Sequence, residues 1–258
     1  MRKDYHMHPK ALTAPENFDA FVQAALEQGI GEICVTDHMP LSISSASDRL
    51  PKDGVEAYCR AVRELAFRYE GILRIRLGIE IDYHPSVLDE VQAVLEKGNF
   101  DYVLASSHMH LFVRDFSRYT ASDFAAAAIE NTYRAVESGL FSAVSHFDMY
   151  RFAIENPTRF PLKDGIYDVL RHEREIALVL DEIRKQKMYL EINPHLAESK
   201  GDFSKMYPEE PIVQMAMERG ILFSYGSDAH KAKSVGAYLS ELEAHPLYGI
   251  ALRQWEKE

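Results

Sequence analysis

Histidine and carboxylate side chains recur in this sequence directly after short apolar segments. The first example is His6 and His8, which are separated by one residue near the start of the chain. Alternate side chains of a β-strand lie on the same face, so these two imidazoles should point the same way. Two neutral imidazoles on one side of a strand supply half of a tetrahedral metal site. The pair therefore predicts a metal site if other segments provide the remaining ligands.

Seven apolar segments end in residues of this kind. In chain order these are His6 and His8, Asp37 and His38, Glu80, His108, His146, Glu191, and Asp228 and His230. The segments alternate with helical patterns, which predicts parallel β-α units. The expected strands are 3–8, 32–36, 73–81, 102–107, 142–145, 188–192 and 221–225, and the expected helices are 15–28, 54–69, 87–96, 122–137, 167–187, 211–219 and 235–243.

Seven units over 258 residues favour an α/β fold, a distorted seven-stranded (β/α)7 TIM-like barrel. We expect one domain, 1–258. A doubly wound open sheet is the alternative. The carboxyl ends of barrel strands converge on one rim, where barrel active sites lie. Residues 42–52 read as a polar loop. The composition is that of a globular protein, with 47% hydrophobic and 27% charged residues.

The net charge of −11 argues against nucleic acid or an anionic membrane as the partner. It is compatible with a small phosphorylated substrate, because bound cations reverse the field inside a pocket. No apolar run is long enough to span a bilayer, and no signal region precedes Arg2, so a cytoplasmic location is expected. The two cysteines, Cys34 and Cys59, predict neither a disulfide framework nor a thiolate metal site. The sequence does not specify an oligomeric state.

A ligand set of imidazoles and carboxylates without thiolate suits Zn, Mn or Fe. The candidates exceed the needs of one tetrahedral centre, so we expect two or three adjacent divalent ions, with Glu80 shared between two of them. Such clusters hydrolyse phosphate esters by clamping the attacking and leaving oxygens.

Several strand-end residues have alternative roles. Asp37 is either a ligand or a turn cap, and Glu191 either contacts metal or bridges backbone amides. Asp148 is placed to orient His146, and Asn193 suits a substrate hydrogen bond. Three further histidines lie beside the candidates but off the strand alternation, which favours supporting roles for His84, His110 and His195.

The motifs, taken in order, resemble the PHP (polymerase and histidinol phosphatase) family. They are His6-x-His8, Thr36-Asp37-His38, Gly78-Ile79-Glu80, Ser107-His108, His146-x-Asp148, Glu191-Ile192-Asn193 and Gly226-Ser227-Asp228-Ala229-His230. The resemblance spans the chain from the first strand to the seventh, and is strongest to the histidinol-phosphatase branch.

The resemblance implies a trinuclear site. In it His6, His8, Glu80 and Asp228 would hold the first ion, Glu80, His108 and His146 the second, and His38 and His230 the third. Many members have one more histidine shortly after the His-x-His pair, which completes the third site, whereas residues 9–15 here contain none. The branch also often has Thr-Ser-Gly after Glu-Ile-Asn, where this chain has Pro194-His195-Leu196.

The resemblance implies hydrolysis of histidinol phosphate by a metal-bridged hydroxide, with Asp228 and His230 as catalytic residues. Arg151 is the preferred phosphate contact because it follows the His146-x-Asp148 motif closely, and Arg114 and Asn193 are further substrate contacts. Two alternatives remain: a nuclease or nucleotide phosphatase of the same family, and a metal-stabilised module without catalytic activity.

Overall fold

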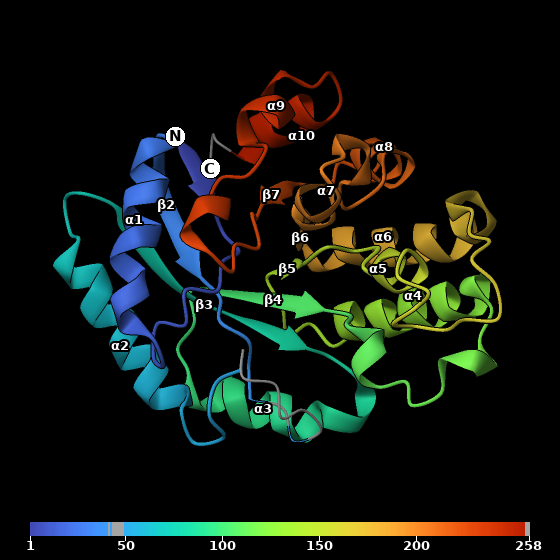
Figure 1. The fold of residues 1–258 in the computed structure, drawn as a ribbon, viewed down its shortest axis with the longest axis horizontal. Helices are drawn as coiled ribbons and strands as arrows, with labels where there is room; N and C mark the ends of the chain where they lie inside the picture. The colour runs from blue at the N-terminus through green and yellow to red at the C-terminus, as the bar shows by residue number, and fades with distance from the viewer. Residues whose placement is uncertain (41, 43–48, 256–258) are drawn as a thin grey trace.

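The protein is built around seven parallel strands, as the computed structural model of residues 1–40, 42 and 49–255 shows (Figure 1). Each strand pairs with its neighbour in the sequence, in the order β1 to β7. The strands are β1 (Arg2–Asp4), β2 (Ile30–Val35), β3 (Arg74–Asp82), β4 (Tyr102–Ser106), β5 (Ala143–Val144), β6 (Tyr189–Ile192) and β7 (Phe223–Tyr225). The prediction of a seven-stranded α/β barrel in one domain is therefore confirmed.

The first and last strands come together and nearly close the barrel. The backbone N–H of Tyr5 donates to the carbonyl of Tyr225 at 2.9 Å, and the N–H of Asp228 donates to the carbonyl of His6 at 2.7 Å. The segment predicted as strand 3–8 is regular only over β1. Beyond it the pairing continues only as an isolated bridge between Met7 and Ala229, and the Asp4 carboxylate accepts hydrogen bonds from the Ser227 and Gly236 N–H groups.

Helices cover the outside of the barrel (Figure 1). Within the described residues they are α1 (Phe18–Glu27), α2 (Val55–Arg68), α3 (Leu88–Lys97), α4 (Ala121–Glu137), α5 (Tyr150–Ile154), α6 (Glu173–Gln186), α7 (His195–Lys200), α8 (Glu210–Glu218), α9 (Leu239–Ala244) and α10 (Tyr248–Trp255). None of these helices combines the length and apolar character that a membrane-spanning helix requires.

All seven predicted helices are present, with shifts at their ends. Helix α4 begins one residue earlier than expected, and its cap is Thr120 rather than Ser122 or Asp123. The Thr120 side chain accepts from the Asp123 N–H, and the Asp123 carboxylate accepts from the Thr120 N–H. This reciprocal pair satisfies two backbone donors that a helix start leaves without partners.

Three helices were not predicted. α5 and α7 have five and six residues, which is too short for a 3.6-residue pattern to be recognised, and they occupy segments expected to be loops. α10 does carry such a pattern, because Tyr248, Ala251, Leu252 and Trp255 are all buried. The predicted loop at 42–52 includes residues 43–48, which lie outside the described part of the chain.

The alternation of side chains along the strands separates two apolar layers. Ile33, Val35 and Val103 pack outward in the large cluster beneath the helices. Cys34 and Tyr102, one residue away, belong to a second cluster inside the barrel, together with Leu104 and Ala143. This inner layer fills the barrel below the predicted site, so the site has a dry, packed floor.

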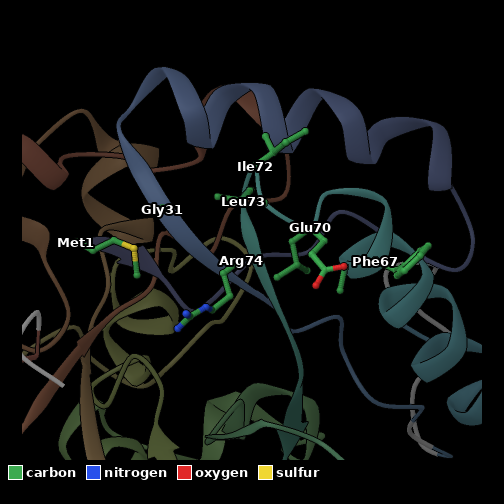
Figure 2. A pocket seen from close by; sticks show the side chains of 10 residues that line it. Met1, Gly31, Phe67, Glu70, Ile72, Leu73 and Arg74 are labelled. Carbon is green, nitrogen blue, oxygen red and sulfur yellow. The ribbon is translucent and has the colours of Figure 1, made fainter.

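Figure 2 shows a pocket of about 600 Å³ at the other end of the barrel. It is lined by residues at the start of β2 and β3, by Met1, and by the end of α2 with the connection that follows it, among them Gly31, Phe67, Glu70, Ile72, Leu73 and Arg74. The lining contains none of the predicted site residues, and barrel active sites form at the carboxyl ends of the strands. The candidate functional residues lie at the opposite rim of the barrel.

Candidate metal centre

The eight residues predicted as metal ligands converge at the carboxyl ends of the strands. Seven are buried and one, His230, is partly exposed. Together they are His6, His8, His38, Glu80, His108, His146, Asp228 and His230. Three triads of their donor atoms lie within 4.8 Å of one another: His6, His8 and Asp228; His6, Glu80 and His146; and His8, His38 and His230.

The backbone around the site is unusual at the positions that bring ligands together. His146 and Asp228 have positive φ angles of 22° and 55°, which non-glycine residues rarely adopt. A Cβ atom on Gly226 would lie 2.1 Å from Oε1 of Glu191 and 2.3 Å from Cβ of His6. Only glycine therefore allows β7 to approach the first strand closely enough for Asp228 to reach His6 and His8. Strained conformations of this kind cluster at functional sites.

The first group of donors has the spacing of a tetrahedral ion site. Nε2 of His6 and Nε2 of His8 are 3.1 Å apart, and each is 3.6 Å from Oε2 of Glu80. Oδ1 of Asp228 lies 3.7 Å from the His6 nitrogen and 3.2 Å from the His8 nitrogen. Four ligands at about 2.0–2.1 Å from one ion are separated from each other by about 3.3–3.4 Å. These donors therefore fit a single ion between them.

Glu80 extends the site toward a second group. Its Oε1 lies 2.9 Å from Nε2 of His146, while its Oε2 faces the first group and lies 2.6 Å from Nδ1 of His38. The His108 ring lies 4.9 Å from the His146 ring. One carboxylate thus presents its two oxygens to two sets of imidazoles, which is the arrangement that a bridging ligand requires.

Buried polar atoms without hydrogen-bond partners lie at this point. Nδ1 of His38 and Oε2 of Glu80 form no hydrogen bond despite their proximity, and Nδ1 of His8 and Nδ1 of His146 have no partner either. Leaving buried polar groups unsatisfied is costly. A bound cation would satisfy Oε2 of Glu80 and Nδ1 of His38, so the donor set fits divalent ions better than it fits an ion-free core.

The charges of the site suit metal binding. Burial and the neighbouring His38 and His230 rings hold the pKa of His8 well below its ordinary value, so its imidazole is neutral. Burial alone would raise the pKa of Glu80, but the positive field of His38 and His6 outweighs it and keeps that pKa low. Burial lowers the pKa of His38, yet Glu80 and Asp82 raise it to about 9. A divalent ion would displace that proton, since metal and proton compete for the same lone pair.

Carboxylates outside the cluster orient its histidines. Oε1 of Glu191 lies 2.7 Å from Nδ1 of His6, and Oε2 of Glu191 accepts from the His146 backbone N–H at 2.8 Å. Asp82 contacts Nδ1 of His108 in the same way and is also paired with Arg49. Such contacts fix the tautomer and ring orientation of metal-binding histidines. Glu191 therefore acts on both a ring and a backbone amide.

Asp82 and Arg49 were missed by sequence reasoning. The signal for Asp82 was available, because it follows Glu80 by two residues on β3 and so lies on the same face. Arg49 lies in the segment expected to be a loop, and it meets the site through a single backbone bridge to His38 and a side-chain contact with Asp82, so no strand pattern indicated it.

Of the predicted supporting residues, Asp37 caps the loop after His8. Its two oxygens accept from the backbone N–H groups of Lys10 and Ala11 at 3.0 and 2.8 Å. Asp148 pairs with Arg151 rather than with His146, since its Oδ2 lies 2.8 Å from the guanidinium.

The predicted substrate contacts have varied surroundings. Arg151 is buried and also contacts Glu209 and the Met206 carbonyl. Asn193 is buried, donates to Glu191 and accepts from the His195 backbone N–H. Arg114 is exposed. Their roles toward substrate stay predictions.

His195 lies nearer the cluster than expected, because its Nδ1 is 3.6 Å from Oδ2 of Asp228. His110 packs beside His108, with ring centres 5.3 Å apart. His84 instead caps the turn at Ser86, where its Nδ1 accepts the backbone N–H.

Comparison with known proteins gives a consistent picture. Residues 4–195 match the model of the PHP domain. A Deinococcus radiodurans protein described as a "Probable histidinol-phosphatase" is 30% identical over 244 residues, covering 90% of this chain and 88% of the relative. The histidinol-phosphatase of Bacillus subtilis is 26% identical, covering 94% and 98%.

A solved structure from Lactococcus lactis has the same fold. It is the histidinol phosphate phosphatase complexed with zinc, L-histidinol and phosphate. The TM-score is 0.77 at 20% identity, and the match covers 97% of this chain and 93% of that chain.

Proposed function

We propose that this chain, which belongs to the PHP domain family, is a metal-dependent phosphatase that hydrolyses histidinol phosphate to histidinol and inorganic phosphate. The observation that carries the proposal is the position of Glu80, whose two oxygens face two adjacent groups of buried imidazoles. Adjacent ions sharing a carboxylate are suited to displacement at phosphorus. The relatives suggest the substrate. They are described as histidinol-phosphatases, and this chain matches them over nearly their whole length.

Two or three divalent ions are the proposed cofactors. The L. lactis protein binds zinc, and the same imidazole and carboxylate donors also suit manganese or iron. When bound, the ions supply Lewis acidity that polarises phosphate oxygens and lowers the pKa of water. We assign His6, His8, Glu80 and Asp228 to the first ion. Glu80, His108 and His146 are assigned to the second.

Asp228 and His230 are the proposed catalytic residues because they stand where the buried cluster meets solvent. The Asp228 side chain is 6% exposed and the His230 side chain 36%. The His230 ring is held in place by its Nδ1, which lies 3.0 Å from the Asp228 carbonyl. This contact leaves Nε2 of His230 free to bind a cation at the entrance of the site, where a phosphate ester would arrive.

A cleft of about 330 Å³ gives access to the same two strand ends, because His8 and His230 both line it. Lys10 and Lys231 are also part of its lining. Two ammonium groups beside the imidazoles would attract a phosphate dianion despite the acidic surface of the protein as a whole. Arg151, Arg114 and Asn193 remain proposed substrate contacts.

The test is a substrate comparison. Apoenzyme loaded with Mn²⁺ or Zn²⁺ is offered L-histidinol phosphate, nucleoside monophosphates and a single-stranded oligonucleotide, and released phosphate or cleaved strand is measured. We expect kcat/KM for histidinol phosphate to exceed that of the other substrates by at least 100-fold. Turnover of nucleotides or strands without turnover of histidinol phosphate would assign the chain to the nuclease or nucleotide phosphatase alternative. Metal binding without any hydrolysis would support a structural module.

A further inference from the structure

A fourth triad of metal-binding side chains lies at the outer edge of the centre. It consists of His195, Asp228 and His230, whose donor atoms lie within 4.8 Å of one another. Nδ1 of His195 is 3.6 Å from Oδ2 of Asp228, the oxygen that is not used in the first donor group. The spacing is close to the separation of about 3.3–3.4 Å expected between two ligands of one ion.

The position of His195 is fixed by the residues around it. It is the first residue of α7, separated from the end of β6 by two residues, and its backbone N–H donates to Oδ1 of Asn193 at 2.9 Å. The Asn193 amide in turn donates to Glu191, which holds His6. The backbone of His195 is therefore set relative to the first donor group by a continuous set of hydrogen bonds, and its side chain is 32% exposed.

The alternative triad of His8, His38 and His230 has other commitments. His8 is a donor of the first group through its Nε2, at 3.2 Å from Asp228. His38 directs its Nδ1 toward Oε2 of Glu80, at 2.6 Å. Residues 9–15 supply no histidine that would join His38 and His230. A third ion on that side would therefore compete with the first ion for His8, whereas Oδ2 of Asp228 is not used by the first donor group.

We propose that a third divalent cation binds to His195, His230 and Oδ2 of Asp228, with Asp228 bridging the first and third ions. This inference rests on the proposed metal-dependent function and adds a ligand to it. The triad is the most exposed part of the centre, with side chains of His195 and His230 that are 32% and 36% exposed. Such a site keeps coordination positions open for water or a phosphate oxygen, as catalytic ion sites do.

The metal content of the protein distinguishes a centre with a third ion bound to His195 from one without it. Wild-type protein, His195→Asn and the control His84→Asn are stripped with chelator, reloaded with Zn²⁺, freed of unbound metal and measured by elemental analysis. His84 is a suitable control because it contacts Ser86 and no member of the cluster. We expect three ions per chain in the wild type and the control, and two in His195→Asn. The three proteins should have similar melting temperatures when loaded.

Two ions in the wild type, or three in His195→Asn, would overturn the proposal. If His195→Asn does not fold, anomalous scattering at the zinc edge from wild-type crystals decides the question. A peak at about 2.0–2.1 Å from a His195 ring nitrogen is expected, and its absence in zinc-loaded crystals contradicts the inference. Failure of this third ion leaves phosphate release by the other two intact. A wild type with less than one ion per chain would instead contradict the proposed function.

Discussion

Oε1 of Glu191 lies 2.7 Å from Nδ1 of His6, on the side of the ring opposite the nitrogen that faces His8. The carboxylate thereby selects the tautomer in which Nδ1 carries the proton. The lone pair of Nε2 is then available to bind a metal ion. Its other oxygen accepts from Asn193 at 2.9 Å and from the His146 N–H. One side chain of β6 thus orients residues of both donor groups without belonging to either.

Glu191→Gln is expected to weaken metal binding by about 10–100-fold, because an amide cannot accept hydrogen bonds at both ends. The NH₂ group of the glutamine then faces either Nδ1–H of His6 or the N–H groups of Asn193 and His146. The dissociation constant for Zn²⁺ is measured by competition with a chromophoric chelator. Glu175→Gln, at an exposed position of α6, serves as the control and should bind like the wild type. Equal affinity in Glu191→Gln would mean that this contact does not tune the site.

Arg151→Met is expected to lower the free energy of unfolding by about 3–5 kcal/mol, because it leaves a buried carboxylate unpaired. The guanidinium lies 2.8 Å from Asp148 and 3.0 Å from Glu209, and its side chain is only 4% exposed. Arg114→Met, at an exposed position, should change stability by less than about 0.5 kcal/mol. Chemical denaturation measures both. Unchanged stability with a raised KM in Arg151→Met would instead support the phosphate contact predicted from the sequence.

The lower end of the barrel carries a pH-dependent contribution that is independent of the metal centre. Glu32 accepts from Arg76 at 2.8 Å and from Arg74 at 3.3 Å, and it is also bonded to the Tyr5 hydroxyl. Burial alone would raise the pKa of Glu32, but the Tyr5 and Arg76 contacts outweigh it and lower that pKa. The unfolded state then binds a proton at higher pH than the folded state. Stability from this group is therefore present above about pH 4.3 and lost as pH falls further.

Glu32→Gln should accordingly cost about 1–2 kcal/mol of stability at pH 7, since it weakens hydrogen bonds from charged donors. The difference from the wild type should shrink as pH falls below about 4. Urea unfolding at several pH values measures it, with Glu130→Gln on the surface of α4 as the control. A difference that stays constant down to pH 3 would show that ionisation of Glu32 does not contribute.

The alternation of apolar segments and helical patterns was sufficient to predict the barrel, because each apolar segment is followed by a polar residue, although β5 itself has only two residues. The ends of the elements were harder. β1 ends at Asp4, whose carboxylate accepts from the N–H groups of Ser227 and Gly236, more than 220 residues away in the sequence. Such tertiary contacts leave no local signal.

The candidate site was predictable at strand ends and not beyond them. His6 and Glu80 were predicted as metal ligands because each lies at the carboxyl end of an apolar segment. The pairing of Asp148 with Arg151, rather than with His146, depends on the turn into α5, a helix too short to be recognised. The approach of His195 to Asp228 depends in the same way on α7 and on the positive φ of Asp228.

The most direct test of the account is phosphate release from L-histidinol phosphate by four preparations: metal-loaded wild type, chelated wild type, metal-loaded Asp228→Asn and metal-loaded Asp181→Asn. Asp181 is an exposed partner of Arg219 on α6 and serves as the control. We predict full activity in the loaded wild type and in Asp181→Asn, and a loss of at least 1,000-fold in the other two. Full activity after chelation, or in Asp228→Asn, would contradict hydrolysis by a metal centre at this rim of the barrel.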